Sequence, residues 1–577
     1  MAAPSIGLNF GTHDAAAAIV IDGAVVAAAE EERFTRVKQT KAFPAQAIEY
    51  CLAEAGVGPD EIGQITLFVD PKLQLLLAAT NLYHGFPHSL GSLVSDLGKY
   101  RQRRRATTLI RASELLAPST AIIPVRHHTA HAASAYLVSP FEDATVVTID
   151  GRGEYETACV FHGRGEHLAR RHSITYPHSI GYLYSMMTRY LGFRPQRDEY
   201  KVMGLAGYGG PGLLQRVNRI ATFDQARGRL RLNLAYFDHH RRPSKARNLY
   251  SDELIRLLGP PRSPGEMITD RHRAIAYAVQ RLTEHLVLSY VAFAQRLVPS
   301  RALCLAGGVA LNGVANAKII ESGLFDSVFV QPAANDAGTS MGAALYVASR
   351  RSAQRACTTL DHAFLGPAYA HQTVATALAA ARHAGYAVQV VTDPADTAAR
   401  LLARDLIIGW FHGRMEFGPR ALGARSILAN PSSATATDRV NALIKRREMF
   451  RPLAPAVLEE HATEYFHLHH AGRLVYPFML ATANVVAAKR NIIPAVIHID
   501  ATARVQTVTR AHNPALWRVI DRFRQRTGLP VVLNTSFNSA DEPIVCTPDD
   551  AVQTFMRRGL DALVIENFLA IRPDLQE

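Results

Sequence analysis

The sequence predicts an α/β protein whose first domain contains two copies of one half-domain. In the first copy, strands are expected at residues 6–10, 16–21 and 24–29, with Asp22-Gly23 as a two-residue hairpin turn. The pattern recurs with strands at 145–149 and 158–161 and a turn at His162-Gly163. Gly11 and Gly151 are 140 residues apart, and so are Gly23 and Gly163. Glycine-turned hairpins are common, but two turns repeated in one register favour duplication.

Helices are expected between and after these strands, as an α/β fold requires. Hydrophobic periodicity predicts helices at 45–55, 127–137 and 272–297, and apolar runs predict strands at 65–69, 302–305 and 328–331. Residues 201–209 contain several glycines and are predicted to form a turn close to a ligand. Residues 71–113 carry mixed apolar and basic side chains, and the arginine-rich run 101–105 is interpreted as a solvated face.

The chain of 577 residues is too long for one ordinary hydrophobic core. An irregular stretch divides it into a first domain at 1–352, a linker at 353–370 and a second α/β domain at 371–577. The composition, 48% apolar and 20% charged, is that of a globular protein.

Bulk properties also exclude several classes. The N-terminus lacks a basic n-region, and the longest apolar stretch, 474–488, is too short for a membrane span, so neither a signal peptide nor a membrane protein is expected. Five scattered cysteines without pairing or zinc spacing are typical of a reducing cytoplasm. The net charge of +13 fits anionic ligands such as nucleotides, phosphates or nucleic acid.

A histidine-rich helix is the first candidate site. His127 and His131 are four residues apart, so they share one helix face, whereas His128 points elsewhere. Asp150 ends a predicted strand, and a histidine pair with a carboxylate suits a first-row divalent metal. Asp336 follows another strand and is a possible fourth ligand. Histidines in an alanine-rich helix are also found as plain core or surface residues, and spacing alone leaves both interpretations open.

Two further segments offer places for anions. Gly307-Gly308 joins a strand to a helix, which places backbone N–H groups at a helix N-terminus where phosphate can bind. Residues 412–451 hold eight lysines and arginines against three acids, with Gly and Pro beside the arginines, which indicates a tight phosphate-binding loop. Arg504 to Thr507 and the loop at 533–538 offer further donors for a nucleotide. The histidines at 467–470 have no partner with matching spacing and are interpreted as surface residues.

Taken together, these motifs resemble the NodU/CmcH family of O-carbamoyltransferases, over nearly the whole chain and in the right order. The resemblance implies an N-terminal domain similar to the universal tRNA threonylcarbamoyl transferase (TsaD-like), of the duplicated actin and sugar-kinase type. It implies a C-terminal domain similar to the YrdC-like enzymes that make carbamoyl adenylates. The duplicated hairpin agrees with the first assignment.

The resemblance also implies roles for single residues. The positions that match the family's metal ligands are His127, His131, Asp150 and Asp336. The ion would be iron(II), although ligand chemistry alone admits manganese or zinc. His13 matches the histidine implicated in transfer. Positions that hold the carbamoyl-adenylate intermediate are matched by Lys38, Gly308 and Asn312. Positions that bind carbamoyl phosphate and ATP, with Mg²⁺ expected beside the ATP, are matched by Arg420, Lys445, Arg451, Arg504, Asn534 and Ser536.

The implied reaction has two steps at two sites. The basic cluster would convert carbamoyl phosphate and ATP into carbamoyl adenylate, and the N-terminal site would transfer the carbamoyl group to a hydroxyl of a natural product, as in antibiotic tailoring. His13 is predicted to be the general base, because the unperturbed pKa of histidine, about 6.5, is near working pH. The alternative for His13 is a hydrogen bond to phosphate.

Two other functions each fit part of the sequence. A tRNA-modification enzyme would fit the net charge. The basic residues, however, concentrate in one pocket bounded by Gly and Pro and do not form an extended basic surface with interspersed aromatic residues, so no nucleic-acid partner is expected. A sugar or acetate kinase would need no second nucleotide-binding domain, so the presence of the second domain argues against this class. Residues 71–113 carry seven basic residues against Asp96 alone, so the acceptor is expected to be a small neutral molecule with a sugar hydroxyl rather than a cationic aminoglycoside.

Overall fold

The computed structural model describes residues 3–85, 90–242, 249–352, 359–433, 435–444 and 447–575. Contacts within the chain form two compact units. The first contains Met1–Val26 and Lys41–Thr359, and the second contains Ala27–Thr40 and Leu360–Glu577. The second unit therefore includes a short N-terminal segment that a division by sequence order assigns to the first domain.

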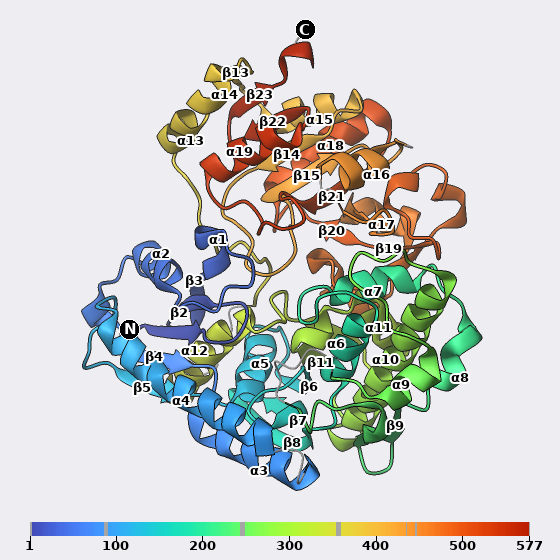
Figure 1. Cartoon of the computed structure of the whole chain (residues 1–577). Helices are drawn as coiled ribbons and strands as arrows, with labels where there is room; N and C mark the ends of the chain where they lie inside the picture. Colours follow the sequence, from blue (N-terminus) through green and yellow to red (C-terminus); the bar gives the residue numbers. More distant parts are fainter. Residues whose placement is uncertain are drawn as a thin grey trace. The chain divides into compact units, whose positions relative to one another are not determined.

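The first unit contains two five-stranded sheets with the same topology (Figure 1). The first has the order β3-β2-β1-β4-β5, with β1 (Ser5–Asn9), β2 (Ala16–Ile21), β3 (Ala24–Glu30), β4 (Gln64–Leu67) and β5 (Ala121–Pro124). The second has the order β12-β11-β6-β7-β8, with β6 (Asp143–Ile149), β7 (Glu156–Arg164), β8 (His167–Thr175), β11 (Ala302–Ala306) and β12 (Ser327–Val330).

Both sheets are built in the same way. The first strand lies in the centre, an antiparallel neighbour follows it on one side, and the two later strands join in parallel on the other side. This repetition confirms the predicted duplication and the actin and sugar-kinase type of the first domain.

The predicted turn at His162-Gly163 is wrong. Strand β7 continues to Arg164, and the turn is at Gly165-Glu166, where Gly165 has a φ of 56°. Gly163 lies inside the strand, where a Cβ would come within 2.6 Å of the ring of Tyr136. The second hairpin is thus longer than the first, and Gly163 is a packing residue rather than the counterpart of Gly23.

Helices of the first unit agree with the predicted ones at four places, which are α2 (Ala45–Ala55), α5 (His127–Tyr136), α10 (Asp270–Leu297) and α11 (Gly313–Glu321). A further helix, α12 (Ala337–Ser352), follows Asp336. Helix α5 packs against β6 and β11, and α12 packs against α5, β1 and β2. Gly342 of α12 permits this approach, because a Cβ there would lie 1.9 Å from the carbonyl oxygen of Ala130 in α5.

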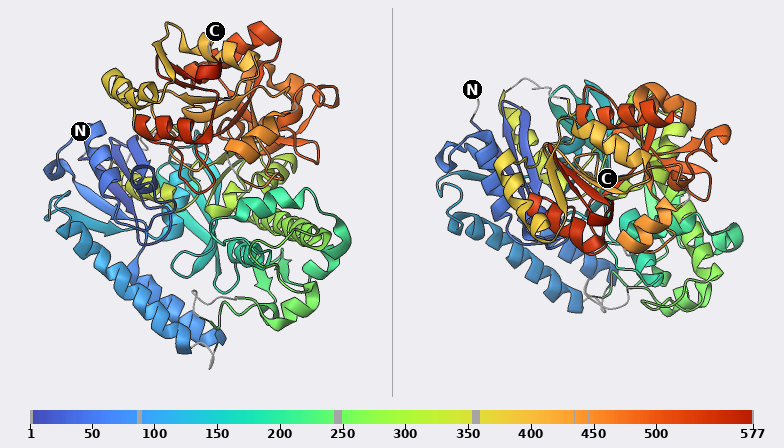
Figure 2. Two further views of the ribbon diagram at one scale, coloured as in Figure 1. Left: turned by 45° about the horizontal axis from the view of Figure 1, so that its top comes forward. Right: turned by 90° about the horizontal axis from the view of Figure 1, so that it is seen from above.

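The segment at 71–113 forms two long helices, α3 (Gln74–Gly85) and α4 (Leu90–Ala112), which lie side by side (Figure 2). Arg101 and Arg105 are exposed on α4, as expected of a solvated face. The predicted turn at 201–209 is wrong in its first part, since α7 (Glu199–Ala206) is helical through the glycine at 204. The rest of this region contains α6 (Ile180–Tyr190), α8 (Leu214–Val217), β9 (Ala221–Asp224), β10 (Arg229–Leu232) and α9 (Asp252–Leu258).

The second unit is built on one eight-stranded mixed sheet. Its order is β13-β23-β22-β14-β15-β21-β16-β20, with β13 (Ala387–Val390), β14 (Ile408–Phe411), β15 (Arg425–Ala429), β16 (Ala454–Leu458), β20 (Gln506–Val508), β21 (Val531–Ser536), β22 (Ala562–Ile565) and β23 (Phe568–Ile571). Helices α15 (Pro394–Ala403) and α18 (Pro514–Thr527) pack on one face with Trp410 and Phe523 in a common core. Helix α19 (Pro548–Arg558) contacts β14 and β22.

A smaller sheet and several surface features complete the second unit. Strands β17 (Phe466–His467), β18 (Thr482–Val485) and β19 (Thr502–Arg504) form the small sheet. His467, His469 and His470 are exposed, as predicted. Among the described residues, we find no helix long and apolar enough to cross a membrane. The four cysteines in the described part of the chain are buried free thiols, and Cys357 lies outside it.

Candidate metal centre and anion site

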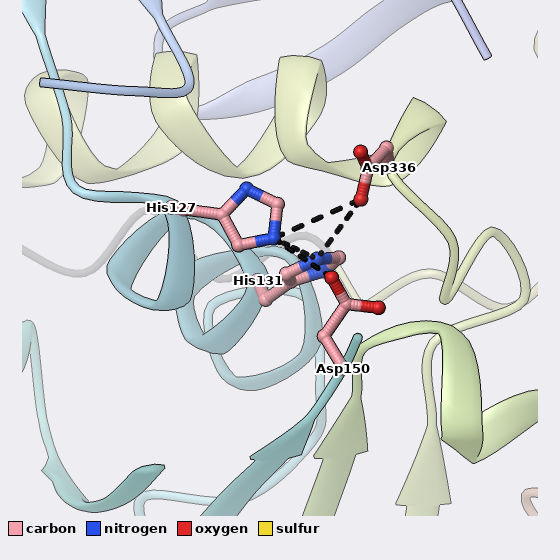
Figure 3. Close-up of side chains that lie close together, drawn as sticks. All are labelled: His127, His131, Asp150 and Asp336. Atoms are coloured by element: carbon pink, nitrogen blue, oxygen red, sulfur yellow. Dashed lines mark hydrogen bonds and ion pairs between the residues drawn. The ribbon is translucent and has the colours of Figure 1, made fainter. Parts of the chain in front are cut away.

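Four residues from three parts of the first unit converge at the carboxyl end of strand β6 of its second sheet (Figure 3). His127 and His131 come from α5, Asp150 follows β6, and Asp336 precedes α12. The two Nε2 atoms are 3.1 Å apart, and Asp150 Oδ2 is 3.1 Å from His127 Nε2. Asp336 Oδ1 lies 3.7 Å from His127 Nε2 and 3.6 Å from His131 Nε2. The structure thus brings together all four residues predicted from the sequence.

The arrangement fits a divalent cation. One ligand atom from each residue lies within 4.8 Å of all the others, and all four side chains are buried. Asp336 Oδ1 is buried and accepts no hydrogen bond from the described residues. A buried carboxylate oxygen without a donor and two imidazole nitrogens turned toward each other are costly unless a cation lies between them.

The protonation states of Asp336 and His131 suit metal binding, whereas Asp336 and Asp150 outweigh burial and raise the pKa of His127. Burial alone would raise the pKa of Asp336, but the neighbouring His13 and His127 hold it below its usual range. Burial and the nearby His127 lower the pKa of His131, which favours the neutral ring. Ionised carboxylates and neutral imidazoles are the forms that bind metal ions.

His128 serves the fold instead. Its Nδ1 lies 2.8 Å from Thr148 Oγ1 and its Nε2 lies 3.1 Å from the carbonyl oxygen of Glu156. Burial and the neighbouring histidines lower its pKa to about 3, so the ring is neutral. The prediction that it points away from the cluster is confirmed.

His13 lies in the loop after β1, beside the metal cluster. Its Nδ1 is 2.9 Å from Asp14 Oδ2, and Asn335 Nδ2 donates to the same oxygen at 3.0 Å. Its Nε2 is 3.9 Å from Asp336 Oδ2. Burial lowers the pKa of His13, but Asp336 and Asp14 outweigh burial and raise it to about 10. A cation bound to Asp336 would offset part of that negative charge and bring the pKa back toward neutrality.

Gly308 and Asn312, predicted to hold an intermediate, both make internal contacts. The N–H of Gly308 donates to Asp150 Oδ1 at 3.0 Å. Asn312 exchanges two hydrogen bonds with Gln280, at 3.1 and 3.2 Å, and its Oδ1 also caps α11 at Ala315. Lys38 belongs to the second unit, where its Nζ donates to the carbonyl oxygen of Ala540 at 3.4 Å.

The basic residues of 412–451 fall into two groups. Arg425 is fully buried and donates to the carbonyl oxygens of Gly413 and Pro367, so it holds the fold. Arg414 donates to the carbonyl oxygen of Leu365, and Arg439 pairs with Asp561 at 2.7 Å. Arg451 pairs with Glu448 at 2.6 Å, and Lys445 lies outside the described residues.

The second group is a set of mutually repelling arginines. Burial, and then the charges of Arg420 and Arg447, lower the pKa of Arg504 well below its usual range. Arg504 Nε is buried and has no hydrogen-bond acceptor among the described residues. Several partly buried guanidinium groups in one place favour an anion between them, so this cluster is a candidate anion site.

Two further predicted residues lie on β21. Asn534 donates to Gln506 Oε1 at 2.8 Å and is 1% exposed. Ser536 Oγ donates to Asn538 Oδ1 at 2.7 Å.

Family models match both parts of the chain. The model described as "Carbamoyltransferase N-terminus" matches residues 5–345, and "Carbamoyltransferase C-terminus" matches residues 399–572. The chain belongs to the carbamoyltransferase family.

Relatives of this carbamoyltransferase span nearly its whole length. It is 38% identical to "Uncharacterized protein sll1178" of Synechocystis, over 98% of the chain and 96% of the relative. It is 37% identical to "Nodulation protein NolNO" of Sinorhizobium fredii, over 96% of the chain and 78% of the relative. Among solved structures, component A of the (R)-2-hydroxyglutaryl-CoA dehydratase of Acidaminococcus fermentans aligns with 61% of the chain and 100% of its own, at 14% identity and a TM-score of 0.35.

Sequence reasoning missed the residues that support the candidate metal ligands of the carbamoyltransferase. Glu154 is fully buried and accepts hydrogen bonds from the N–H groups of His127, at 3.1 Å, and Asp70, at 2.9 Å. Gly153 lies against the ring of His127, because a Cβ there would come within 2.9 Å of it. A Gly-x-Gly-Glu sequence directly after Asp150 was the available signal.

The loop that carries Arg420 has supports of the same kind. Glu416 Oε1 accepts hydrogen bonds from the N–H groups of Leu422 and Ala424, at 2.8 and 2.7 Å. Trp410 Nε1 donates to the carbonyl oxygen of Gly423 at 2.9 Å. The loop is therefore fixed before any ligand arrives, as an anion site requires.

Proposed function

We propose that this carbamoyltransferase is ATP-dependent and works in two steps, one in each unit. The observation that carries the proposal is the partly buried cluster of Arg420, Arg447 and Arg504, whose like charges favour the binding of a polyanion. Carbamoyl phosphate and ATP, the latter with Mg²⁺, are the polyanions in question. In this proposal the second unit is the YrdC-like domain that forms carbamoyl adenylate, and the first is the TsaD-like transfer domain.

In the first step, water cleaves carbamoyl phosphate into carbamate and phosphate. A carbamate oxygen then attacks the α-phosphorus of ATP, and pyrophosphate leaves with the electron pair of the broken P–O bond. The product is carbamoyl adenylate. Arg420, Arg451, Arg504 and Lys445 would bind the phosphate groups, and Asn534 and Ser536 would offer uncharged contacts. Exclusion of bulk water protects the labile intermediate.

In the second step, an acceptor hydroxyl attacks the carbamoyl carbon and AMP leaves. His127, His131, Asp150 and Asp336 would hold the ion, for which we propose iron(II), with manganese or zinc as alternatives. When bound, the ion supplies a Lewis acid that stabilises negative charge on oxygen. Gly308 and Asn312 are the residues of the first unit proposed to face the adenylate.

His13 is the proposed general base for the acceptor hydroxyl. Its Nδ1 faces Asp14, which Asn335 holds in place, so its Nε2 is the atom available to take the proton. This geometry of a base oriented by a second group supports the assignment.

The proposed acceptor is a sugar hydroxyl of a neutral natural product, in a cytoplasmic biosynthetic reaction. Exposed Arg101 and Arg105 on α4 would repel a polycationic aminoglycoside. No nucleic-acid or membrane partner forms part of the proposal.

The test is product formation by the purified chain with carbamoyl phosphate, ATP, Mg²⁺ and iron(II), followed by mass spectrometry over a panel of hydroxylated acceptors. We expect AMP and pyrophosphate in equal amounts and an acceptor heavier by one carbamoyl group. Carbamoyl transfer from carbamoyl phosphate without ATP consumption would overturn the adenylate step. Aminoglycosides as the best acceptors would overturn the acceptor class.

A further inference from the structure

The amide group of Asn534 is held in one orientation by Gln506. Asn534 Nδ2 donates to Gln506 Oε1 at 2.8 Å and approaches the carbonyl oxygen of Ala421 at 3.4 Å. Gln506 Nε2 donates to the carbonyl oxygen of Leu422 at 2.7 Å. The carbonyl oxygen of Leu422 can only accept, so the NH₂ of Gln506 must face it, and the side-chain oxygen of Gln506 then faces Asn534. The NH₂ of Asn534 therefore faces Gln506, and its oxygen faces the other way.

That oxygen is a buried acceptor without a donor. Asn534 is 1% exposed, and its Oδ1 accepts no hydrogen bond from the described residues. A buried carbonyl oxygen left unpaired costs about 1–3 kcal/mol, so its persistence points to a ligand that donates.

The residues that contact Asn534 adjoin the anion site along the chain. Arg420 directly precedes Ala421, whose carbonyl oxygen Asn534 Nδ2 approaches, and Arg504 is two residues before Gln506. Phosphate groups at neutral pH offer acceptors, and arginine offers donors. An additional acceptor therefore contributes nothing to binding the phosphate oxygens and suits a ligand group that donates a hydrogen bond, as the N–H of a carbamoyl group does.

We propose that Asn534 Oδ1 accepts a hydrogen bond from the amino group of the carbamoyl moiety, and that Gln506 is the positioning residue that turns this oxygen toward it. The inference rests on the proposed function, because it assumes that carbamoyl phosphate binds among these arginines. Acetyl phosphate has the same phosphate and carbonyl groups but a methyl group in place of the amino group. The pair of amides thus selects carbamoyl phosphate against acyl phosphates that lack an N–H.

The test compares pyrophosphate release from ATP with carbamoyl phosphate and with acetyl phosphate, for wild type, Gln506→Met and Gln506→Glu. Methionine removes the acceptor that fixes Asn534, so we expect the ratio of the two kcat/KM values to fall about 10- to 100-fold, within the range that one hydrogen bond to a substrate group can supply. Glutamate keeps an acceptor for Asn534 but loses the donor to Leu422, so the ratio should stay near that of wild type. Its added negative charge affects both phosphates alike and cancels in the ratio.

Three outcomes would overturn the inference. One is an unchanged ratio in Gln506→Met, provided that its circular dichroism and thermal unfolding match wild type. Another is an equal loss of selectivity in both variants, which would assign the effect to Leu422. The third is a loss, in Gln506→Met, of the preference for ATP over inosine triphosphate, which lacks the adenine amino group. Asn534 would then bind the base of the nucleotide and not the carbamoyl group.

The proposed function can fail separately. If wild type releases no pyrophosphate with carbamoyl phosphate, the adenylate step itself is wrong. If it does release pyrophosphate and Gln506→Met keeps its selectivity, only the role of the two amides is wrong.

Discussion

The carboxylate of Glu154 accepts a hydrogen bond from the backbone N–H of His127 at 3.1 Å and so caps the helix that carries two of the four candidate metal ligands. The first N–H groups of a helix have no partner within it, and a negative charge there is favourable. Glu154 is fully buried and also holds the N–H of Asp70. It therefore fixes the start of α5 before any ion binds.

Replacing Glu154 by glutamine should weaken metal binding. Glutamine retains one acceptor but loses the charge and the second acceptor, and changes of this kind beside a metal ligand cost about 10- to 100-fold in affinity. The measurement is a competition titration with a chromophoric chelator. Glu156→Gln is the matched control, because that carboxylate is equally buried but pairs with Arg170. Equal weakening in both variants would contradict a specific role for Glu154.

Asp336→Asn should remove the ion from the isolated protein. The asparagine oxygen carries no charge, and the site would then hold one carboxylate for a divalent cation. We expect about one metal per chain in wild type loaded with iron(II) under anaerobic conditions and much less in the variant, measured by elemental analysis. His128→Gln should keep the metal, since His128 contacts Thr148 and the carbonyl oxygen of Glu156. Retention of full metal content in Asp336→Asn would exclude the proposed ligand set.

His13→Asn should stop carbamoyl transfer and leave adenylate formation intact. Asparagine cannot act as a base, and His13 lies in the first unit, whereas the arginine cluster lies in the second. Transfer is measured by mass spectrometry of the acceptor, and adenylate formation by pyrophosphate release. Loss of both activities in a folded variant would count against this division of labour.

Gly342→Ala should destabilise the first unit. The added Cβ would lie 1.9 Å from the carbonyl oxygen of Ala130, so α12 and α5 must move apart. Overpacking of this kind costs about 1–3 kcal/mol or more in the free energy of unfolding. Gly98→Ala in α4 is the control, because its Cβ meets nothing within 4 Å, and alanine there should stabilise the helix by about 0.5–1 kcal/mol. Equal stability of the two variants in denaturant titrations would refute the close approach.

His239 should make the protein sensitive to acid. Its Nε2 donates to the carbonyl oxygen of Pro177 at 2.9 Å, and its Nδ1 is buried with no partner in the described part of the chain. Burial lowers its pKa from 6.5 to about 3. A lowered folded pKa means that the stability contribution is complete above pH 6.5 and is lost as the pH falls toward 3.

His239→Phe keeps an aromatic ring beside Tyr182 and removes this titration. Thermal unfolding measured from pH 7 to pH 4 should therefore show a smaller loss of Tm in the variant than in wild type. Parallel curves would show that another group governs the acid sensitivity.

Much of the metal site could be predicted from the sequence because its determinants are local. The spacing of His127 and His131 places both on one helix face, and Asp150 and Asp336 follow apolar strands, whose carboxyl ends meet at one edge of a sheet. The repeated strand pattern predicted the duplicated topology for the same reason, although the repeated turn at Gly163 was wrong.

Other features depend on contacts between residues far apart in the sequence, which no local pattern records. The capping of α5 by Glu154 and the orientation of Asn534 by Gln506 span 27 and 28 residues. Gly163 resembled a turn glycine, but the ring of Tyr136 is what requires it. Of eight basic residues at 412–451, some, such as Arg425, proved to bind backbone carbonyl groups, because a guanidinium group satisfies carbonyls as readily as phosphates.

The sequence by itself thus determined the class of fold, the repeat within it and the residue types available for chemistry, since hydrophobic periodicity and short spacings act within a single element. Only the tertiary structure decided which polar groups are paired. It also decided that Ala27–Thr40 belongs with the second unit. Burial forces every polar atom to find a partner, and those partners come from whichever strand or helix the fold brings alongside.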